Sequence, residues 1–235
     1  MSTLSIIVPV LNEGSHVARK LSLLQPLRRR GVHVVVVDGG SHDDTMAQAL
    51  DWADVILKAP RGRASQMNAG ARVAKGEILL FLHADTVLPP WAHERVFEAL
   101  APFTEAWGRF DVHIDSPSRM LEVVSWAMNT RSRWTGMATG DQALFMHRSL
   151  FDRMGGFPDL PLMEDIAMSK LLKQQSWPVC LRECVRTSAR RWEQHGVWRT
   201  IFLMWRLRAA YFFGADPRNL ARAYGYQPRD TCHER

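Results

Sequence analysis

Short apolar segments alternate with helical patterns along the first part of the chain, and this alternation constrains the fold most. Residues 4–10, 32–37, 54–57 and 77–82 have the length and apolar character of strands, and residues between them show helical spacing or composition. The last of these strands is apolar enough to be covered on both faces, as strands of parallel sheets are. The pattern therefore predicts a doubly wound α/β unit, a mostly parallel mixed sheet flanked by helices.

The first helical stretches differ in how clearly they begin. Val17, Leu21 and Leu24 lie at helical spacing after the first strand. Ser41, with Asp44 three residues later, has the pattern of a capping box and predicts that a helix begins there.

The second half of the chain is less regular. It predicts strands at 107–114 and 143–146, and helices at 90–100, 118–129, 149–154 and 165–174. Because the sequence has no repeat, low-complexity tract or Ser/Gly-rich linker, we expect one domain over residues 1–235.

The final helical candidate, residues 196–213, is apolar around nearly its whole circumference. Its arginines, Arg199, Arg206 and Arg208, exclude a membrane span. We expect the helix to pack on the domain, with contact to a membrane surface as the alternative.

Composition places weak limits on function. The chain has 235 residues with 30 Lys+Arg against 24 Asp+Glu, so its formal charge of +6 favours phosphates or acidic lipid surfaces as partners. We expect no nucleic acid partner. The first residues lack the pattern of a signal peptide, so we expect a cytoplasmic chain, with peripheral contact to the inner face of the membrane as a variant.

Polar residues follow three of the apolar strands. Glu13 comes after the first strand, Asp38 after the second, and His83 and Asp85 after the fourth. In open α/β sheets the ligand site lies beyond the carboxyl ends of the strands, so we expect these side chains to share a pocket. His83 and Asp85, two residues apart, have metal-site spacing, and one carboxylate suffices for Mg²⁺ or Mn²⁺ when substrate phosphates complete the shell.

Neither GxGxxG nor a phosphate-binding GxxxxGK[ST] loop occurs, which argues against hydride transfer and ATP hydrolysis. The ordered motifs at residues 5–13 (SIIVPVLNE), 37–41 (VDGGS) and 80–86 (LFLHADT) instead resemble family 2 glycosyltransferases of the GT-A fold. Gly155-Gly156-Phe157 and the pair Glu164-Asp165 extend the resemblance, which covers about residues 4–192. The His-Ala-Asp form and residues 190–193 resemble a bacterial subgroup associated with arsenosugar biosynthesis.

The resemblance assigns roles to individual positions. Asp165 would be the catalytic base with Glu164 beside it, and Asp85 would hold the metal, with His83 in place of the family's first acidic residue. Residues implied to border the nucleotide donor are Pro9, Leu11, Glu13, Asp38, Arg63, Asn68 and Asp85. Candidates for the acceptor side are Gly140, Asp141 and Gln142, which precede a strand, and Arg191 with Trp192.

The resemblance implies a metal-dependent, inverting transfer of a sugar from a nucleoside-diphosphate donor to a hydroxyl acceptor. A UDP-sugar is the favoured donor and a GDP-sugar the alternative. Residues 1–90 would form the nucleotide-binding half, 91–192 the acceptor-side half and 193–235 a C-terminal helical extension. The Gln-x-x-Arg-Trp motif of processive members lacks its Gln here, which favours non-processive transfer.

Two alternatives stay open from the sequence. One is a sugar-phosphate nucleotidyltransferase on the same kind of sheet, although its usual Gly-rich basic loop is missing from residues 9–13. The other is a non-catalytic protein of this fold that binds nucleotide sugars or associates with membranes.

Overall fold

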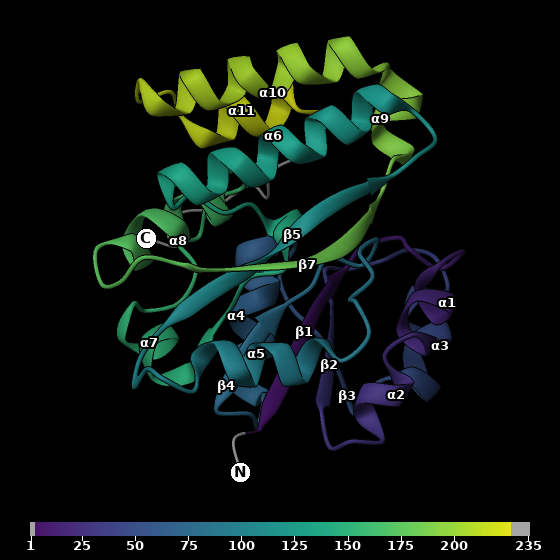
Figure 1. Ribbon diagram of the computed structural model, residues 1–235. Helices are drawn as coiled ribbons and strands as arrows, with labels where there is room; N and C mark the ends of the chain where they lie inside the picture. The colour runs from purple at the N-terminus through teal and green to yellow at the C-terminus, as the bar shows by residue number, and fades with distance from the viewer. Residues whose placement is uncertain (1–2, 227–235) are drawn as a thin grey trace, which may run out of the picture.

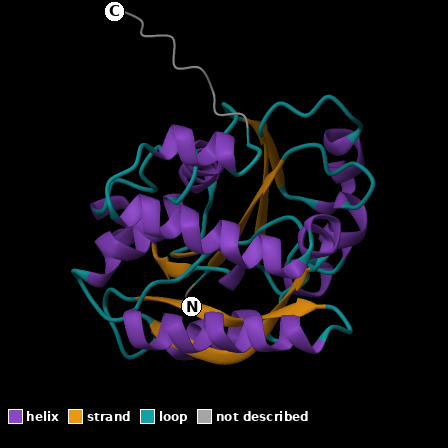
Figure 2. Ribbon diagram, turned by 90° about the horizontal axis from the view of Figure 1, so that it is seen from above, coloured by secondary structure: helices purple, strands orange, loops and turns teal. Residues whose placement is uncertain are grey.

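The structure, a computed structural model, describes residues 3–226. Within them a seven-stranded sheet runs in the order β3-β2-β1-β4-β6-β5-β7, with helices on both faces (Figures 1 and 2). This arrangement confirms the predicted doubly wound, mostly parallel mixed sheet. The strands are β1 (Leu4–Val10), β2 (His33–Asp38), β3 (Val55–Lys58), β4 (Ile78–Phe81), β5 (Trp107–Asp115), β6 (Phe145–His147) and β7 (Val179–Ser188).

The first four strands form a parallel unit, β3-β2-β1-β4, whose side chains alternate between two hydrophobic cores. On β1, Ile6 and Val8 belong to one core, whereas Ile7 lies in the other with Val37 of β2. Since successive strand residues point to opposite faces, a continuous apolar run is what a strand covered on both sides requires. Gly70 lets the helix α4 (Arg63–Val73) lie close to this sheet, because a Cβ there would fall 2.5 Å from Ile7 Cγ2.

The prediction that a helix begins at Ser41 is wrong. The helix α3 (Thr45–Ala49) begins four residues later. The hydroxyl of Ser41 donates a hydrogen bond back to Asp38 Oδ1 at 2.5 Å and so stabilises the turn after β2 instead of capping a helix. The other helices of the first half are α1 (Val17–Ser22), α2 (Gln25–Arg28) and a short 3₁₀ turn at Leu50–Trp52.

The second half adds an antiparallel strand and then a parallel pair. Strand β6 lies between β4 and β5 and is antiparallel to both, whereas β5 pairs with β7 in parallel. The sequence analysis did not predict β7 or the helix Arg190–His195, and it placed the last helix, Pro217–Ala223, only within a C-terminal helical extension of residues 193–235. The helices of this half are α5 (Ala92–Leu100), α6 (Arg119–Thr135), α7 (Arg148–Arg153), α8 (Glu164–Lys173), α9 (Arg190–His195), α10 (Val197–Phe212) and α11 (Pro217–Ala223), with a 3₁₀ turn at Gly140–Gln142.

Helices α6, α10 and α11 lie together beyond β5 and β7, at the end of the molecule away from the N-terminus (Figure 1). Helix α10 packs through Leu207 onto a small core that contains Leu162, Met163 and Leu220. Among residues 3–226, no helix combines the length and the hydrophobicity that crossing a bilayer would need. Because Leu207 is buried in this small core, the prediction that residues 196–213 pack on the domain is right for one side of the helix.

Candidate active site

A cavity of about 430 Å³ opens beyond the carboxyl ends of β1 and β4. Helix α8 contributes its first residues to the wall, and α9, α10 and the chain after α11 close the other side. Predicted site residues from six separate parts of the sequence therefore meet in one place. The predicted site residues on its wall are Pro9, Leu11, Glu13, Arg63, His83, Asp85, Asp141, Glu164, Asp165, Arg191 and Trp192.

One side of the cavity combines acidic groups with arginines. Glu13 Oε1 accepts a hydrogen bond from Arg190 Nη2 at 3.1 Å, which joins the end of β1 to the start of α9. Desolvation opposes the charge of Arg63, but the nearby carboxylates of Glu164 and Asp85 hold its pKa above the usual value. Because Arg63 is open to solvent, that attraction is partly screened. An anionic ligand here would meet guanidinium groups on two sides.

Asp38 and Asn68 are not among the residues that line this cavity, so their expected place beside the nucleotide donor stays a prediction. Asp38 is fully buried, and its carboxylate accepts hydrogen bonds from the backbone N–H groups of Gly40 and Ser41, each at 3.0 Å. Asn68 is bonded through its side-chain amide to the backbone N–H and C=O of Phe157, at 2.8 and 2.9 Å. Both side chains fix loops beside the cavity.

The 3₁₀ turn at Gly140–Gln142 contacts both His83, which follows β4, and Asp165 in the first turn of α8. His83 Nδ1 lies 3.1 Å from Asp141 Oδ1, and the backbone N–H of Gly140 donates to Asp165 Oδ2 at 2.8 Å. A side chain at Gly140 would collide with the His83 ring, because its Cβ would lie 2.3 Å from Nε2. Burial favours the neutral form of Asp141, yet His83, Arg63 and Arg208 lower its pKa below the usual value.

Gln142 is fully buried and does not reach the cavity. Its Oε1 accepts a hydrogen bond from the backbone N–H of Thr139 at 3.2 Å, and its Nε2 donates to Asn129 Oδ1 at 3.3 Å. Of the three residues expected on the acceptor side in this turn, only Asp141 faces the cavity, while Gly140 and Gln142 shape the turn that carries it.

The acidic pair at the start of α8 is held by the backbone. Asp165 Oδ1 accepts a hydrogen bond from the N–H of Ile166 at 2.7 Å, while Oδ2 faces Gly140. Glu164 is buried, and burial together with the negative charge of Asp165 raises its pKa to about 7. Near neutral pH the two carboxyl groups therefore carry less than two negative charges, as expected when like charges compete.

The C-terminal part supplies Arg191, as expected, and three lining residues that sequence reasoning did not place in the site: Tyr224, Arg190 and Arg208. Arg191 stacks on the ring of Tyr224, with its guanidinium carbon 3.6 Å from the ring centroid, and donates to the Tyr224 carbonyl at 2.7 Å. Arg190 and Arg208 also line the cavity. From the sequence, Arg208 counted only as one of the charges that exclude a membrane span. No local pattern indicates which residues a helix will contact in the folded chain.

The oxygen atoms available at the cavity wall suit a hard divalent cation whose coordination shell is completed by phosphate oxygens. Asp85 offers a carboxylate at the cavity wall, and the Thr86 hydroxyl donates to Asp85 Oδ1 at 3.3 Å. Among residues 3–226 no cluster of three or more His, Cys, Asp and Glu side chains forms a self-sufficient metal site. A single carboxylate at a phosphate-binding cavity is a typical arrangement for Mg²⁺, and similar oxygen ligands suit Mn²⁺.

Comparison with known protein families gives a direct result. The model of "Glycosyl transferase family 2" matches residues 5–155, which is more than half of the chain. The chain belongs to glycosyltransferase family 2.

Relatives in this family share moderate similarity with the chain. A glycosyltransferase of Mycobacterium tuberculosis is 29% identical over 165 residues, which cover 66% of this chain and 62% of the relative. The undecaprenyl-phosphate 4-deoxy-4-formamido-L-arabinose transferase of Aeromonas hydrophila is 29% identical over 106 residues, covering 40% of this chain and 32% of the relative. The matched region thus spans between about a third and three fifths of the length of these curated relatives.

Solved structures confirm the GT-A fold. The mannosyltransferase PcManGT of Pyrobaculum calidifontis, in complex with GDP-Man and Mn²⁺, has a TM-score of 0.62 at 22% identity, over 96% of this chain and 69% of its own. A fragment of S. aureus TarS in complex with UDP has a TM-score of 0.63 at 16% identity, over 79% of this chain and 60% of that one.

Proposed function

We propose that this chain transfers a sugar from a nucleoside-diphosphate donor to a hydroxyl acceptor, with inversion at the anomeric carbon and with help from Mg²⁺ or Mn²⁺. The observation that supports it most is that Asp85 and the pair Glu164-Asp165 line one cavity. In the same cavity, the turn at Gly140–Gln142 contacts His83 through Asp141 and Asp165 through Gly140. Membership of glycosyltransferase family 2 supports the same reaction class.

The chemistry assigns one task to each part of the cavity. Asp165 accepts the proton of the acceptor hydroxyl while its oxygen forms a bond to the anomeric carbon, and the bond from that carbon to the donor phosphate breaks. A divalent cation, held by Asp85, would supply positive charge for the departing diphosphate. Arg63 and Arg190 line the cavity where they would add charge-assisted hydrogen bonds to phosphate oxygens.

The orientation of Asp165 comes from the backbone. Its two carboxylate oxygens accept hydrogen bonds from the N–H groups of Ile166 and Gly140, which fix the plane of the carboxylate before an acceptor binds. Preorganisation of this kind lowers the entropic cost of reaching the transition state. His83 holds Asp141 in the same turn, so we propose that it acts on the site's shape more than on the metal.

For the donor we propose a UDP-sugar, with a GDP-sugar as the alternative. Similar folds bind UDP and GDP-Man, which supports both choices. We propose that transfer is non-processive and that the chain is cytoplasmic. We also propose that the chain belongs to the subgroup associated with arsenosugar biosynthesis, on the basis of its His83-Ala84-Asp85 form and residues 190–193.

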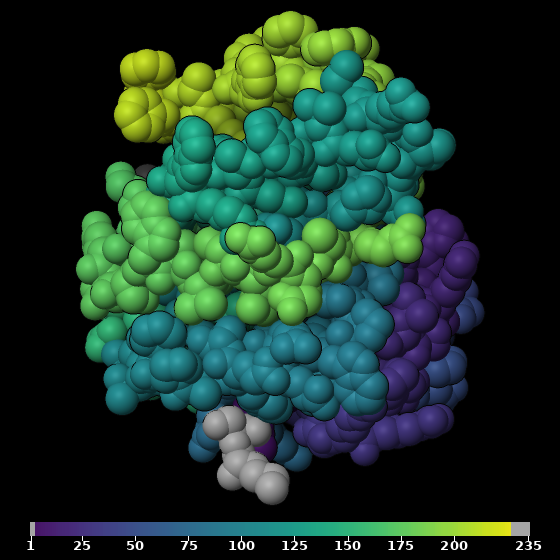
Figure 3. All heavy atoms as spheres, in the orientation of Figure 1, coloured from purple at the N-terminus to yellow at the C-terminus, as the bar shows by residue number. Residues whose placement is uncertain are grey.

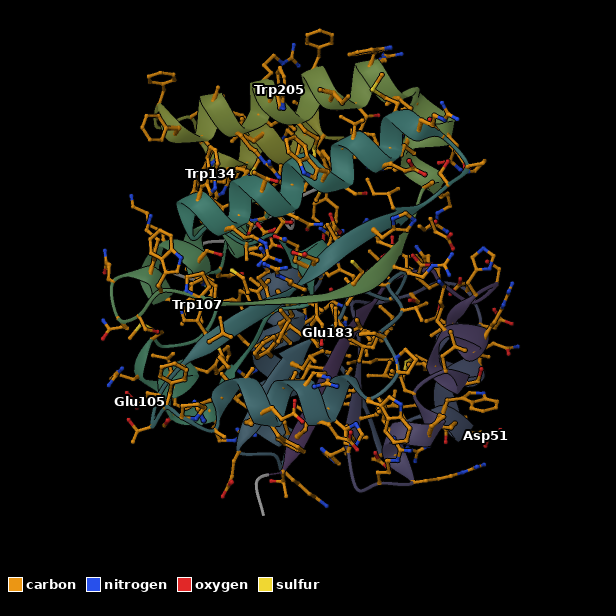
Figure 4. All side chains as sticks on the ribbon, in the orientation of Figure 1. Asp51, Glu105, Trp107, Trp134, Glu183 and Trp205 are labelled. Carbon is orange, nitrogen blue, oxygen red and sulfur yellow. The ribbon has the colours of Figure 1, made fainter. Side chains whose placement is uncertain are left out.

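We further propose contact between α10 and an anionic membrane surface. Its outer side exposes five large aromatic side chains, each at least 61% exposed, and α6 adds two more. Figure 3 shows α6 and α10 forming one end of the molecule, and Figure 4 labels Trp205 and Trp134 there. The aromatic residues are Trp198, Phe202, Trp205, Phe212 and Phe213 on or directly after α10, and Trp126 and Trp134 on α6.

The charge of α10 matches such a surface. Its sequence contains Arg199 and Arg206, both exposed, and no acidic residue. Exposed aromatic rings beside arginines are typical of helices that lie in the interface of anionic bilayers. A second copy of the chain is a poorer partner, because two faces of the same positive charge would repel each other.

The test of the proposed reaction is the identity of the released product. A purified chain incubated with a UDP-sugar or GDP-sugar, Mn²⁺ and candidate acceptors should release nucleoside diphosphate and lose this activity with EDTA. Release of pyrophosphate from a nucleoside triphosphate and a sugar phosphate would instead establish a nucleotidyltransferase. Tight nucleotide-sugar binding without turnover under all acceptors would favour the non-catalytic alternative.

A further inference from the structure

Two arginines, Arg208 of α10 and Arg131 of α6, lie within electrostatic reach of Asp165. Arg208 of α10 lines the cavity, and Arg131 of α6 lies within electrostatic reach of both Arg208 and Asp165. Among residues 3–226 neither guanidinium makes an ion pair within 4 Å, although several other arginines do. In Arg131, Nε and Nη2 are buried and lack a hydrogen-bond partner within the chain.

Such an arrangement is costly for the ligand-free protein. A buried donor without an acceptor loses its hydration and gains nothing in return, and a charged donor loses most. Burial and the charge of Arg208 lower the pKa of Arg131 to about 10, so it stays protonated at neutral pH. Burial also lowers the pKa of Arg208, against the opposing pull of Asp165 and Asp141. Two positive charges therefore lie on this side of the cavity with no ion-pair partner within 4 Å among residues 3–226, an arrangement that suits an anionic ligand.

We propose that Arg208, with Arg131 behind it, forms a subsite for a phosphomonoester group carried by the acceptor. The assignment to the acceptor rests on the proposed function, because it is Asp165 that marks where the acceptor hydroxyl binds. The opposite side, with Asp85, Glu13 and Arg190, has its own arginine and its own acidic groups. A phosphomonoester carries a charge of about −1.5 to −2 near pH 7, which matches two guanidinium groups better than a carboxylate does.

The phosphate could belong to a soluble acceptor or to a lipid headgroup, and both present the same chemistry to Arg208. The experiment therefore has a soluble arm and a vesicle arm. Each uses the full chain, the variant Arg208→Gln and the matched control Arg206→Gln, which removes an exposed arginine from the same helix.

In the soluble arm, the chain is first saturated with UDP and Mn²⁺ so that the donor side is filled, and phenyl phosphate is then titrated by calorimetry. We expect binding to the wild type, equal binding to Arg206→Gln, and binding about 10- to 100-fold weaker in Arg208→Gln, since a charge-assisted contact is lost. UDP affinity should be the same in all three proteins. Equal phenyl phosphate binding by Arg208→Gln and the wild type overturns the proposal. So does a wild type that neither binds phenyl phosphate nor prefers phosphatidic acid vesicles.

In the vesicle arm, phosphatidylcholine vesicles contain either phosphatidic acid, a phosphomonoester, or phosphatidylglycerol, a phosphodiester. Because Arg206 lies on the proposed membrane face, Arg206→Gln should weaken binding to both kinds of vesicle alike and keep any preference between them. A preference for phosphatidic acid that Arg208→Gln loses and Arg206→Gln keeps assigns the phosphate to a lipid. Phenyl phosphate binding without that preference assigns it to a soluble acceptor.

Two further measurements separate this proposal from other causes. Should neither UDP nor GDP bind, the proposed function is contradicted, and phenyl phosphate titrated alone still tests the subsite. Arg131→Gln serves as a second variant and should also weaken phenyl phosphate binding. Without ligand, both variants should unfold at temperatures no lower than the wild type, because an unpaired buried charge is removed. A large fall in both unfolding temperatures would assign these arginines to structure and overturn the subsite.

Discussion

The ionisation of Glu164 links the candidate site to the stability of the fold. Burial and the charge of Asp165 raise its pKa from 4.5 to about 7, so the folded chain binds this proton more tightly than the unfolded chain does. The resulting stabilisation is fully present below pH 4.5 and is lost as the pH rises through about 7. At 1.36 kcal/mol per pKa unit, the free energy involved is on the order of 3 kcal/mol.

Glu164→Gln removes the titrating group while keeping nearly the same volume. We expect the free energy of unfolding of the wild type to fall relative to that of the variant between pH 5 and pH 8, by up to about 3 kcal/mol. Urea denaturation at a series of pH values measures this difference. The control is Glu77→Gln, which removes an exposed glutamate and should leave the pH dependence of the wild type unchanged.

Parallel stability curves for the wild type and Glu164→Gln would refute the reasoning. They would mean that Glu164 ionises in the folded chain as it does in water. At neutral pH, Asp165 would then lie beside an ionised Glu164 and not beside a protonated one. The proposed base would then work beside a second full charge, and its affinity for the acceptor proton would have to be explained by other groups.

Three further outcomes test the site and the surface. Asp165→Asn should keep nucleoside-diphosphate binding but slow transfer by about 10²- to 10⁴-fold in a product-release assay, and unchanged transfer would remove Asp165 from the role of base. Gly140→Ala should slow transfer by up to about 100-fold with nucleotide affinity retained, because its Cβ would push against the His83 ring and shift the turn that holds Asp165. Trp205→Ser should weaken co-sedimentation with anionic vesicles by about 10-fold, whereas Leu50→Ser, at an exposed site away from α10, should not; equal loss in both would contradict the membrane face.

The parallel half of the sheet could be predicted from sequence because each strand carries its own local signal. Strand β1 is buried at every position and, apart from Ser5, apolar, as expected of a strand whose two faces are both covered. Strand β7 gives no such signal. It lies at the edge of the sheet, and charged residues such as Arg182 and Glu183 interrupt its alternation. Its pairing with β5 joins segments about 70 residues apart, as in Arg186 with His113, and no local pattern encodes such a pairing.

The motif residues show a second limit. Sequence identified Asp38 and Asn68 as members of the site as readily as Asp85, because a motif records that a residue type is required at a position but not what it contacts. The structure separates them by their hydrogen bonds. The side chains of Asp38 and Asn68 form hydrogen bonds with backbone groups of neighbouring loops, whereas the carboxylate of Asp85 lines the cavity wall.

Helix α10 shows why some of the site lay beyond sequence reasoning. The sequence predicts an apolar surface on nearly every side of this helix, so it cannot say which side packs. Leu207 packs against Leu162 and Leu220, and this contact decides which side of the helix is buried. Leu220 lies in α11, whose bounds within the expected C-terminal helical extension no sequence pattern predicted. The same choice turns Arg208 toward Asp165 and leaves Trp205 exposed. The membrane face and the phosphate subsite of this helix can thus be tested separately with Trp205→Ser. If the acceptor is soluble, this variant should leave transfer intact. If the acceptor is held in a membrane, transfer should fall together with vesicle binding.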